Sequence, residues 1–319
     1  MNFRGLIVAV VILATLGGVL YWSQHRKPAE EAGAGTTPNA APVIVKIDPA
    51  NVTELVIKQK EPVALKKTAA GLWQITEPKP YPADQEAVAG VLSTLSGLNA
   101  DRVVEEKASN RKQYGLDPAS VELDIRGKDN AMRQLLLGDD TPAGGDVYAA
   151  LASDPRVFTI ASYNKSSLAK SLNDLRDKSL LTLDADKVSR VEVLKKGADL
   201  EFDRTKDGWQ ILKPSSSPAD SSAVNDLVRT VTTAKMDLST TNDAAAAFAR
   251  ATPLATAKLT GDTGVQTLEV RKDKDTYYAK SSVVDGTYKV DSTLGQALDK
   301  KIDDFRQKKS ATSPASAGK

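Results

Sequence analysis

Apolar and polar residues alternate in several short runs along the chain, which is the pattern of half-buried β-strands. The first three runs are bounded by the turn signals Glu61-Pro62 and Ala70-Gly71, and their apolar positions are Leu55 and Ile57, Val63 and Leu65, and Trp73 and Ile75. After Asp84, a typical helix N-cap, the period changes to a helical stripe of Val88, Val91, Leu92 and Leu95. Strands are predicted again over 121–125, 135–137, 147–148 and 157–160. A closing helix carries Leu168, Leu172 and Leu175.

The whole pattern occurs twice. An offset of 136 residues places Trp73-Gln74-Ile75 on Trp209-Gln210-Ile211 and Asp84 on Asp220. The offset later shortens to 130, which places Tyr148 on Tyr278 and gives the second closing helix Leu298, Ile302 and Phe305. Strands joined by short turns predict an α+β fold built twice, each copy an antiparallel sheet with helices packed on one face. We therefore expect the two copies to share strand order and helix placement.

The duplication also sets the expected boundaries. The first α+β repeat is predicted over 43–180 and the second over 188–309, with residues 181–187 as the hinge between them. The tail 310–319 (SATSPASAGK) has no apolar periodicity and is predicted to be disordered.

The N-terminus predicts a membrane anchor. Residues 5–22 contain no charge and are rich in Val, Leu and Ile, and as a helix they span about 27 Å, close to the hydrocarbon thickness of a bilayer. A cleaved signal peptide is the alternative, but bulky and basic residues rather than small ones follow the apolar run. Residues 1–4 then form a cytoplasmic tip, and residues 23–42, rich in Pro, Ala, Gly and Thr in their later part, form a flexible tether.

The orientation of this anchor is less clearly marked, because Arg4 precedes it and Arg26 and Lys27 follow it. An N-terminal apolar anchor usually exports the long segment behind it. The body is therefore expected on the extracytoplasmic side, in the periplasm or at the cell exterior.

Composition removes several classes of function. The 319 residues contain 43 basic and 41 acidic side chains, a net charge of +2 that predicts no nucleic-acid partner. The absence of cysteine excludes disulfides, iron–sulfur clusters and cysteine nucleophiles, and the single histidine, His25, excludes any site that needs two. No Walker A sequence occurs, so the chain is not itself an ABC ATPase. No cofactor and no metal site are predicted.

Two repeated residue pairs resemble functional sites, but the sequence pattern favours a structural role for each. Trp73 and Trp209 fit sugar-stacking platforms, but each occupies an inward position of an alternating strand, which favours core packing. Asp84 and Asp220 fit a carboxylate pair, but one helix cap in each copy explains both.

Other candidates match a motif only in part. Ser167 and Lys170 fit the S-x-x-K pattern of penicillin-interacting enzymes, but no K-T-G sequence accompanies them. Asp184 and Asp186 begin like a calcium loop, but Val188 occupies the next ligand position. The basic end of the last helix, Lys300-Lys301 and 306–309, is interpreted as a solvated helix terminus, with attraction to anionic lipid as the alternative. His25 is interpreted as an interfacial polar residue.

One family resemblance rests on the anchor, the two Trp-Gln-Ile strands, the Ala-Asp helix starts, the run Tyr114-Gly115-Leu116-Asp117-Pro118, and Leu175-Arg176-Asp177-Lys178. With these features the chain resembles the bacterial family called domain of unknown function 4340 over about Val52 to Lys309. The second copy departs from the pattern, with Ala251-Thr252-Pro253 in place of Gly-Leu-Asp-Pro. The resemblance implies a single-pass protein of the bacterial cytoplasmic membrane, whose genes often lie near ABC-type export systems of the gliding-motility kind. The resemblance implies no catalytic residue in this chain.

These observations favour a non-enzymatic, membrane-anchored scaffold or accessory subunit with an envelope protein as partner, for example a subunit of an ABC-type export complex. A binding module for cell-wall glycan or another polymer is the first alternative. A hydrolase that uses carboxylates or Ser167 and Lys170 is the second.

Overall fold

The computed structural model describes residues 42–239 and 244–307. The predicted cytoplasmic tip, anchor at 5–22, nearly all of the tether and the tail at 310–319 lie outside the described residues. Among the residues that are described, no helix has both the length and the apolar character needed to cross a bilayer.

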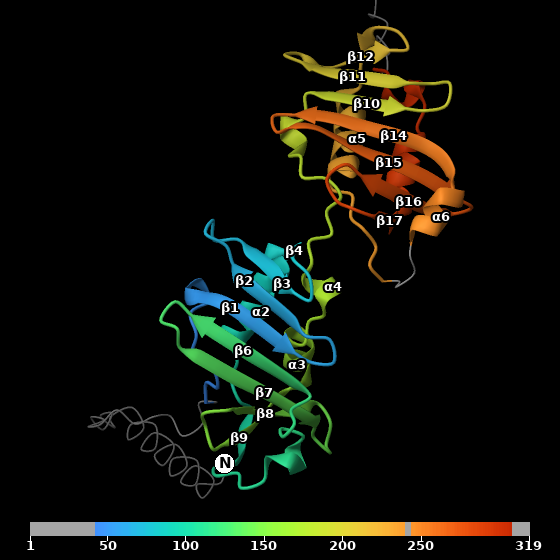
Figure 1. Cartoon of the computed structure of the whole chain (residues 1–319). Coiled ribbons are helices and arrows are strands. Elements are labelled where there is room, and N and C mark those ends of the chain that lie inside the picture. The colour runs from blue at the N-terminus through green and yellow to red at the C-terminus, as the bar shows by residue number, and fades with distance from the viewer. Residues whose placement is uncertain (1–41, 240–243, 308–319) are drawn as a thin grey trace, which may run out of the picture. The chain divides into compact units, whose positions relative to one another are not determined.

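The first repeat is built on one antiparallel sheet of nine strands (Figure 1). Their order across the sheet is β4-β3-β2-β1-β6-β7-β8-β9-β5. The strands are β1 (Val52–Lys58), β2 (Val63–Lys67), β3 (Trp73–Glu77), β4 (Tyr81–Pro82), β5 (Arg102–Glu105), β6 (Val121–Gly127), β7 (Met132–Asp140), β8 (Asp146–Leu151) and β9 (Val157–Ala161).

The second repeat carries an antiparallel sheet of eight strands in the corresponding order, β13-β12-β11-β10-β14-β15-β16-β17. The strands are β10 (Arg190–Leu194), β11 (Leu200–Thr205), β12 (Gly208–Lys213), β13 (Ser217–Pro218), β14 (Thr252–Gly261), β15 (Gly264–Asp273), β16 (Thr276–Ser281) and β17 (Thr287–Val290). Each has its counterpart in the first sheet, and among the described residues only β5 has none. The predicted duplication is confirmed.

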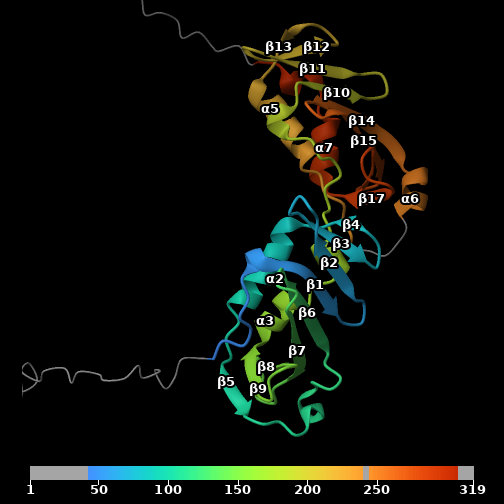
Figure 2. The ribbon, with the colours of Figure 1, turned by 60° about the vertical axis from the view of Figure 1, so that its left-hand side comes forward.

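Helices cover one face of each sheet, as Figure 2 shows for α2 and α3 and for α5 and α7. The long helices α2 (Gln85–Ser96) and α5 (Ser221–Thr232) begin at Asp84 and Asp220, whose carboxylates each accept two backbone N–H groups. The shorter helices are α3 (Ser162–Leu168), α4 (Leu172–Leu175), α6 (Ala244–Arg250) and α7 (Ser292–Asp299). Four 3₁₀ turns complete the described elements, η1 (Pro49–Asn51), η2 (Arg111–Tyr114), η3 (Ala185–Lys187) and η4 (Ile302–Phe305).

The closing helix of each repeat is broken rather than continuous, which differs from the prediction. In the first repeat α3 ends at Leu168, and α4 starts anew after Ser171, which forms a capping box with Asp174. In the second repeat α7 ends at Asp299, and the backbone N–H of Lys301 donates to Asp304 Oδ2 over 2.8 Å. In both copies an aspartate side chain accepts a hydrogen bond from a backbone N–H at the equivalent position, and the closing helix is interrupted there.

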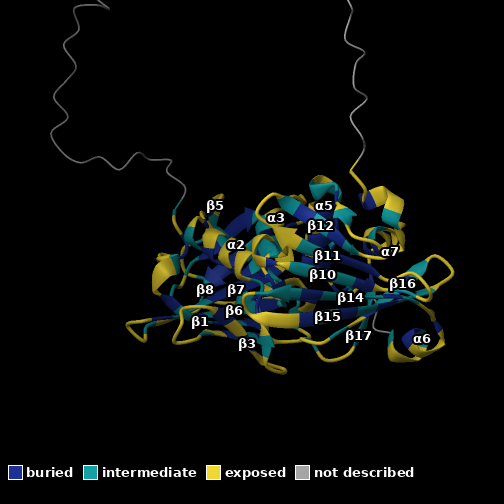
Figure 3. Cartoon of the chain, turned by 90° about the horizontal axis from the view of Figure 1, so that it is seen from above, coloured by how far each residue is buried: buried dark blue, intermediate teal, exposed yellow. Residues whose placement is uncertain are grey.

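Each repeat has its own core between the sheet and its helices, visible as dark blue positions in Figure 3. The predicted stripe of α2 is buried against the first sheet, and that of α5 against the second. Trp73 and Trp209 are 7% and 4% exposed, as strand alternation predicts. Phe202 and Phe305 meet edge to face in the second core, with ring centroids 5.0 Å apart.

The segment expected as a hinge packs into the second core instead. Within 181–187, Leu181 and Leu183 are buried in that core, and Asp184 caps η3. Ser179 forms a β-bridge with Lys235, as Val43 does with Asn99 in the first repeat. Residues 179–184 are thus the opening segment of the second repeat, because the sheet and helix of that repeat bury the apolar side chains of this segment.

Candidate functional site: a polar groove in the second repeat

The two repeats differ most on the sheet face that α2, α3, α5 and α7 leave uncovered. In the first repeat this face carries a second small apolar cluster on β7, β8 and β9. Leu136, Ala150 and Val157 are 9%, 0% and 0% exposed, and Leu116 covers them at 2% exposure. The ring of Tyr114 packs on Tyr148 with centroids 4.9 Å apart.

The run Tyr114-Gly115-Leu116 positions the Leu116 side chain that covers this cluster. Gly115 has a left-handed φ of +64°, and the backbone N–H of Leu116 donates to the Arg111 carbonyl over 3.2 Å. A Cβ on Gly138 in β7 would lie 2.1 Å from the Tyr114 carbonyl oxygen, so the loop lies directly on the sheet. The motif that supports the family resemblance therefore has a structural role in closing one face of the first repeat.

The equivalent face of the second repeat is polar, and the short helix α6 covers part of it. Strand register places Leu136, Ala150 and Val157 on Glu269, Lys280 and Thr287, none of which is buried. The short helix α6 lies beside this face, with Phe248 4.5 Å from the Arg271 guanidinium. Between α6 and strands β16 and β17 an open groove of about 1000 Å³ remains, which we call the β17 groove.

The chemistry of the β17 groove combines aromatic surface with charge. Its lining includes Tyr278, Tyr288, Arg250, Lys280, Asp237 and Lys289. Lys289 pairs with Asp237 at 3.4 Å, whereas Arg250 and Lys280 are exposed and form no ion pair within the described residues. The Thr287 hydroxyl oxygen, also in the lining, is buried without a hydrogen-bond partner in the described part of the chain. The groove thus offers a ligand two cations that have no ion-pair partner in the described part of the chain.

Asp237 is held ionised at one end of the groove. Hydrogen bonds from the Ser239 hydroxyl and backbone N–H, followed by the Lys289 ammonium, lower the pKa of the Asp237 carboxyl. The backbone N–H of Ser239 donates to Asp237 Oδ1 over 2.9 Å, which turns the chain at this point.

The residues predicted as candidates remain apart from this groove. Ser167 and Lys170 are not joined, because the Ser167 hydroxyl donates to the Tyr163 carbonyl over 2.9 Å and Lys170 follows the end of α3. Asp184 accepts from the backbone N–H of Asp186, as a cap does. Over 42–239 and 244–307, no cluster of three metal-ligating side chains occurs.

The basic C-terminal stretch is only partly described. Lys300 and Lys301 follow the last residue of α7, and Arg306 pairs with Asp303 at 3.4 Å. Residues 308–309 and His25 lie outside the described residues.

The structure is a duplicated α+β fold in which an apolar cluster closes one sheet face of the first repeat, whereas the equivalent face of the second repeat is polar and carries the β17 groove beside α6. Residues 73–217 and 209–317 each match the model of the family described as Domain of unknown function (DUF4340). The chain belongs to this family and contains two tandem copies of its domain. Neither the curated proteins nor the solved structures include a match to it.

Proposed function

We propose that this protein is a non-enzymatic accessory subunit or scaffold that is anchored in the bacterial cytoplasmic membrane and holds another envelope protein. The apolar run at 5–22 supports the anchor and an extracytoplasmic body. The family resemblance supports an ABC-type export complex as the assembly to which the partner belongs.

The β17 groove is the observation that supports partner binding. It exposes cations that have no partner in the described residues, beside two tyrosines, on a sheet face that the first repeat keeps closed. Tyrosine and arginine are enriched where proteins bind one another. A partner segment with acidic side chains would neutralise Arg250 and Lys280.

Affinity purification from detergent-solubilised membranes tests the proposal. The full chain is compared with a variant carrying Arg250→Glu and Lys280→Glu, and with a control carrying Lys60→Glu and Lys206→Glu. Each variant lowers the net charge equally, and all four side chains are exposed. The wild type and the control should recover the same membrane protein in stoichiometric amount, and the groove variant should lose it. Equal recovery by all three proteins would contradict the proposal.

A binding module for cell-wall glycan is the second candidate, because tyrosine faces beside polar groups also suit a sugar polymer. The same purification separates the two functions. Recovery of glycan without a stoichiometric protein would favour the second candidate.

A further inference from the structure

The side chains around the two equivalent tryptophans differ between the repeats. In the second repeat Trp209 lies opposite Arg204 in the β11–β12 pair, and its indole N–H donates to Asn225 Oδ1 over 2.8 Å. The Arg204 guanidinium donates to the Asp186 carbonyl over 2.6 Å and to Asn225 Oδ1 over 3.4 Å, and it lies 5.0 Å from the centroid of the indole ring. Side chains of the second repeat therefore both accept the indole N–H and cover the ring.

The first repeat has neither of these side chains. Lys67 lies opposite Trp73 in the β2–β3 pair, so it occupies the position of Arg204. At the equivalent helix position, α2 has Ala89 where α5 has Asn225. Within the described part of the chain only the backbone of Trp73 forms hydrogen bonds, and the indole N–H has no acceptor. A buried tryptophan usually finds a partner for this group.

An open groove of about 340 Å³, which we call the Trp73 groove, lies at this place in the first repeat. Residues of η1, β2, β3 and α2 line it, including Ala50, Lys67, Trp73, Ala89, Leu92 and Ser93. The lining thus contains both positions at which the repeats differ. Because the Trp73 side chain is only 7% exposed, its ring belongs to the core and only an edge of it reaches the groove.

The charge of the Trp73 groove is positive. The Lys67 ammonium lies 5.2 Å from the centroid of the Trp73 ring, and it forms no ion pair and no hydrogen bond within residues 42–239 and 244–307. No aspartate or glutamate is among the described residues that line the groove. The groove therefore offers a cation and an indole N–H beside an apolar wall of Ala89 and Leu92. An ionised carboxylate, which only accepts hydrogen bonds, complements such a pair of donors.

We propose that the Trp73 groove binds a small organic acid, namely a carboxylate on a short aliphatic stem. One carboxylate oxygen accepts from the Trp73 indole N–H, as Asn225 Oδ1 does for Trp209, and the carboxylate pairs with the Lys67 ammonium. The stem packs on the apolar wall. A volume of about 340 Å³ lies at the lower end of the range for small-molecule sites. This site is separate from the β17 groove and goes beyond the proposed function.

Nuclear magnetic resonance of the full chain in detergent micelles, with isotope-labelled tryptophan indoles, tests the inference. The chain has three tryptophans, and Trp73→Phe identifies the signal of the Trp73 indole N–H. The probe is glutarate. Glutaramide is the first control ligand, because it keeps the length of glutarate and carries no charge. The peptide N-acetyl-Ala-Glu-Ala-amide is the second, because it presents a carboxylate from a polypeptide.

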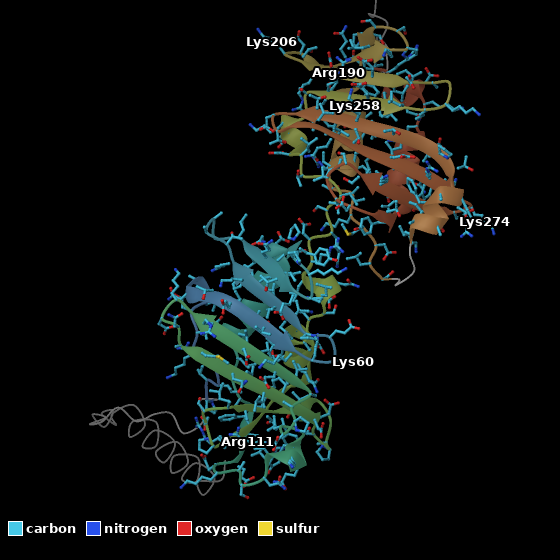
Figure 4. All side chains as sticks on the ribbon, in the orientation of Figure 1. Lys60, Arg111, Arg190, Lys206, Lys258 and Lys274 are labelled. Carbon is cyan, nitrogen blue, oxygen red and sulfur yellow. The ribbon has the colours of Figure 1, made fainter. Side chains whose placement is uncertain are left out.

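Two variants alter the Trp73 groove in different ways. Ala89→Asn introduces the carboxamide that accepts the indole N–H in the second repeat, and Lys67→Met removes the ammonium but keeps an unbranched side chain. Lys60→Met is the matched control, because Lys60 is an exposed lysine of the same repeat that lies outside the groove (Figure 4). Far-ultraviolet circular dichroism of each variant should match that of the wild type.

Glutarate should shift the Trp73 indole signal to saturation in the wild type and in Lys60→Met, and it should leave the other two indole signals in place. Each groove variant should bind glutarate about tenfold more weakly or worse, and the wild type should bind glutaramide more weakly by the same factor. In Ala89→Asn the Trp73 signal should lie near the ligand-bound position before glutarate is added.

Four results would overturn the inference. Glutarate that leaves the Trp73 signal unchanged would show that no small acid binds there. Equal binding of glutaramide would exclude recognition of the carboxylate charge, and equal binding of glutarate to Ala89→Asn would show that the site is elsewhere. Tighter binding of the peptide than of glutarate would identify a polypeptide side chain, rather than a free acid, as the ligand.

Discussion

Replacement of Trp209 by alanine is expected to destabilise the second repeat and to leave the first unchanged. Trp209 is 4% exposed and lies in the core between the second sheet and α5. Its indole N–H donates to Asn225 Oδ1 over 2.8 Å, and the Arg204 guanidinium lies 5.0 Å from the ring centroid. The two repeats have separate cores, so the loss should stay in one of them.

The expected magnitude follows from these contacts. A buried Trp→Ala change costs about 3–5 kcal/mol through lost burial and the cavity left behind. Trp209→Phe keeps most of the ring and removes the indole N–H, so it should cost about 1–2 kcal/mol. Because a domain is typically stable by only about 5–15 kcal/mol, the alanine variant loses a large fraction of the stability of the second repeat.

Urea unfolding of the fragment 43–319 measures this effect. The fragment retains Trp73 and Trp209, one tryptophan in each repeat. In Trp209→Ala the remaining fluorescence reports only the first repeat, while far-ultraviolet circular dichroism reports both. The fluorescence midpoint should match that of the first repeat in the wild type, and the dichroism should show an added transition at lower urea.

Two outcomes would refute this reasoning. If the dichroism of Trp209→Ala keeps the wild-type midpoint, the tryptophan does not stabilise the core. If the Trp73 fluorescence shifts to lower urea together with the dichroism, the two cores do not unfold independently.

Further predictions concern a glycine, a helix cap, a carboxylate and the topology. Gly115→Ala should destabilise the first repeat by about 1–3 kcal/mol or more in urea unfolding, because φ is +64° and the new Cβ would lie 2.3 Å from Asp139 Cγ. Gly71→Ala should destabilise it less, because Gly71 has φ +79° but open space where the new Cβ would lie. Asp220→Ala should lower the stability of the second repeat by about 1 kcal/mol in the same assay. The folded pKa of the Asp237 carboxyl is lowered, so the stabilisation by Asp237 is present above the unfolded pKa of about 3.9 and is lost as pH falls through the folded pKa. Asp237→Asn should therefore have a lower melting temperature than the wild type at pH 6, and the difference should shrink at pH 3. Alkaline phosphatase fused after residue 309 should be active in cells, and an inactive fusion would contradict an extracytoplasmic body.

Most of the fold could be predicted because the pattern of apolar and polar residues occurs separately in each repeat. The alternation at Leu55, Ile57, Trp73 and Ile75 predicted β1 and β3, and the stripe after Asp84 predicted α2 with the correct buried face. The second copy repeated these signals in register. Broken closing helices were missed, because Leu168, Leu172 and Leu175 keep a helical spacing across the break.

The β17 groove was not found from the sequence, although a signal for it was present. The aligned strands replace Leu136, Ala150 and Val157 with Glu269, Lys280 and Thr287, which is a loss of apolar residues on one sheet face. Because the residues at these positions differ in chemical type between the two copies, they are not part of the pattern that marks the duplication. The depth of the groove depends on how α6 packs beside β16 and β17, and no local pattern specifies that packing.

Site-specific photo-cross-linking in intact cells tests the central claim most directly, namely that the β17 groove binds an envelope protein. A photoreactive phenylalanine replaces Lys280 in one strain and Lys206, an exposed residue of the same repeat outside the groove, in another. Position 280 should give one discrete cross-linked protein of the envelope, and position 206 should not. Cross-links to that protein in equal yield from both positions, or from neither, would contradict the claim.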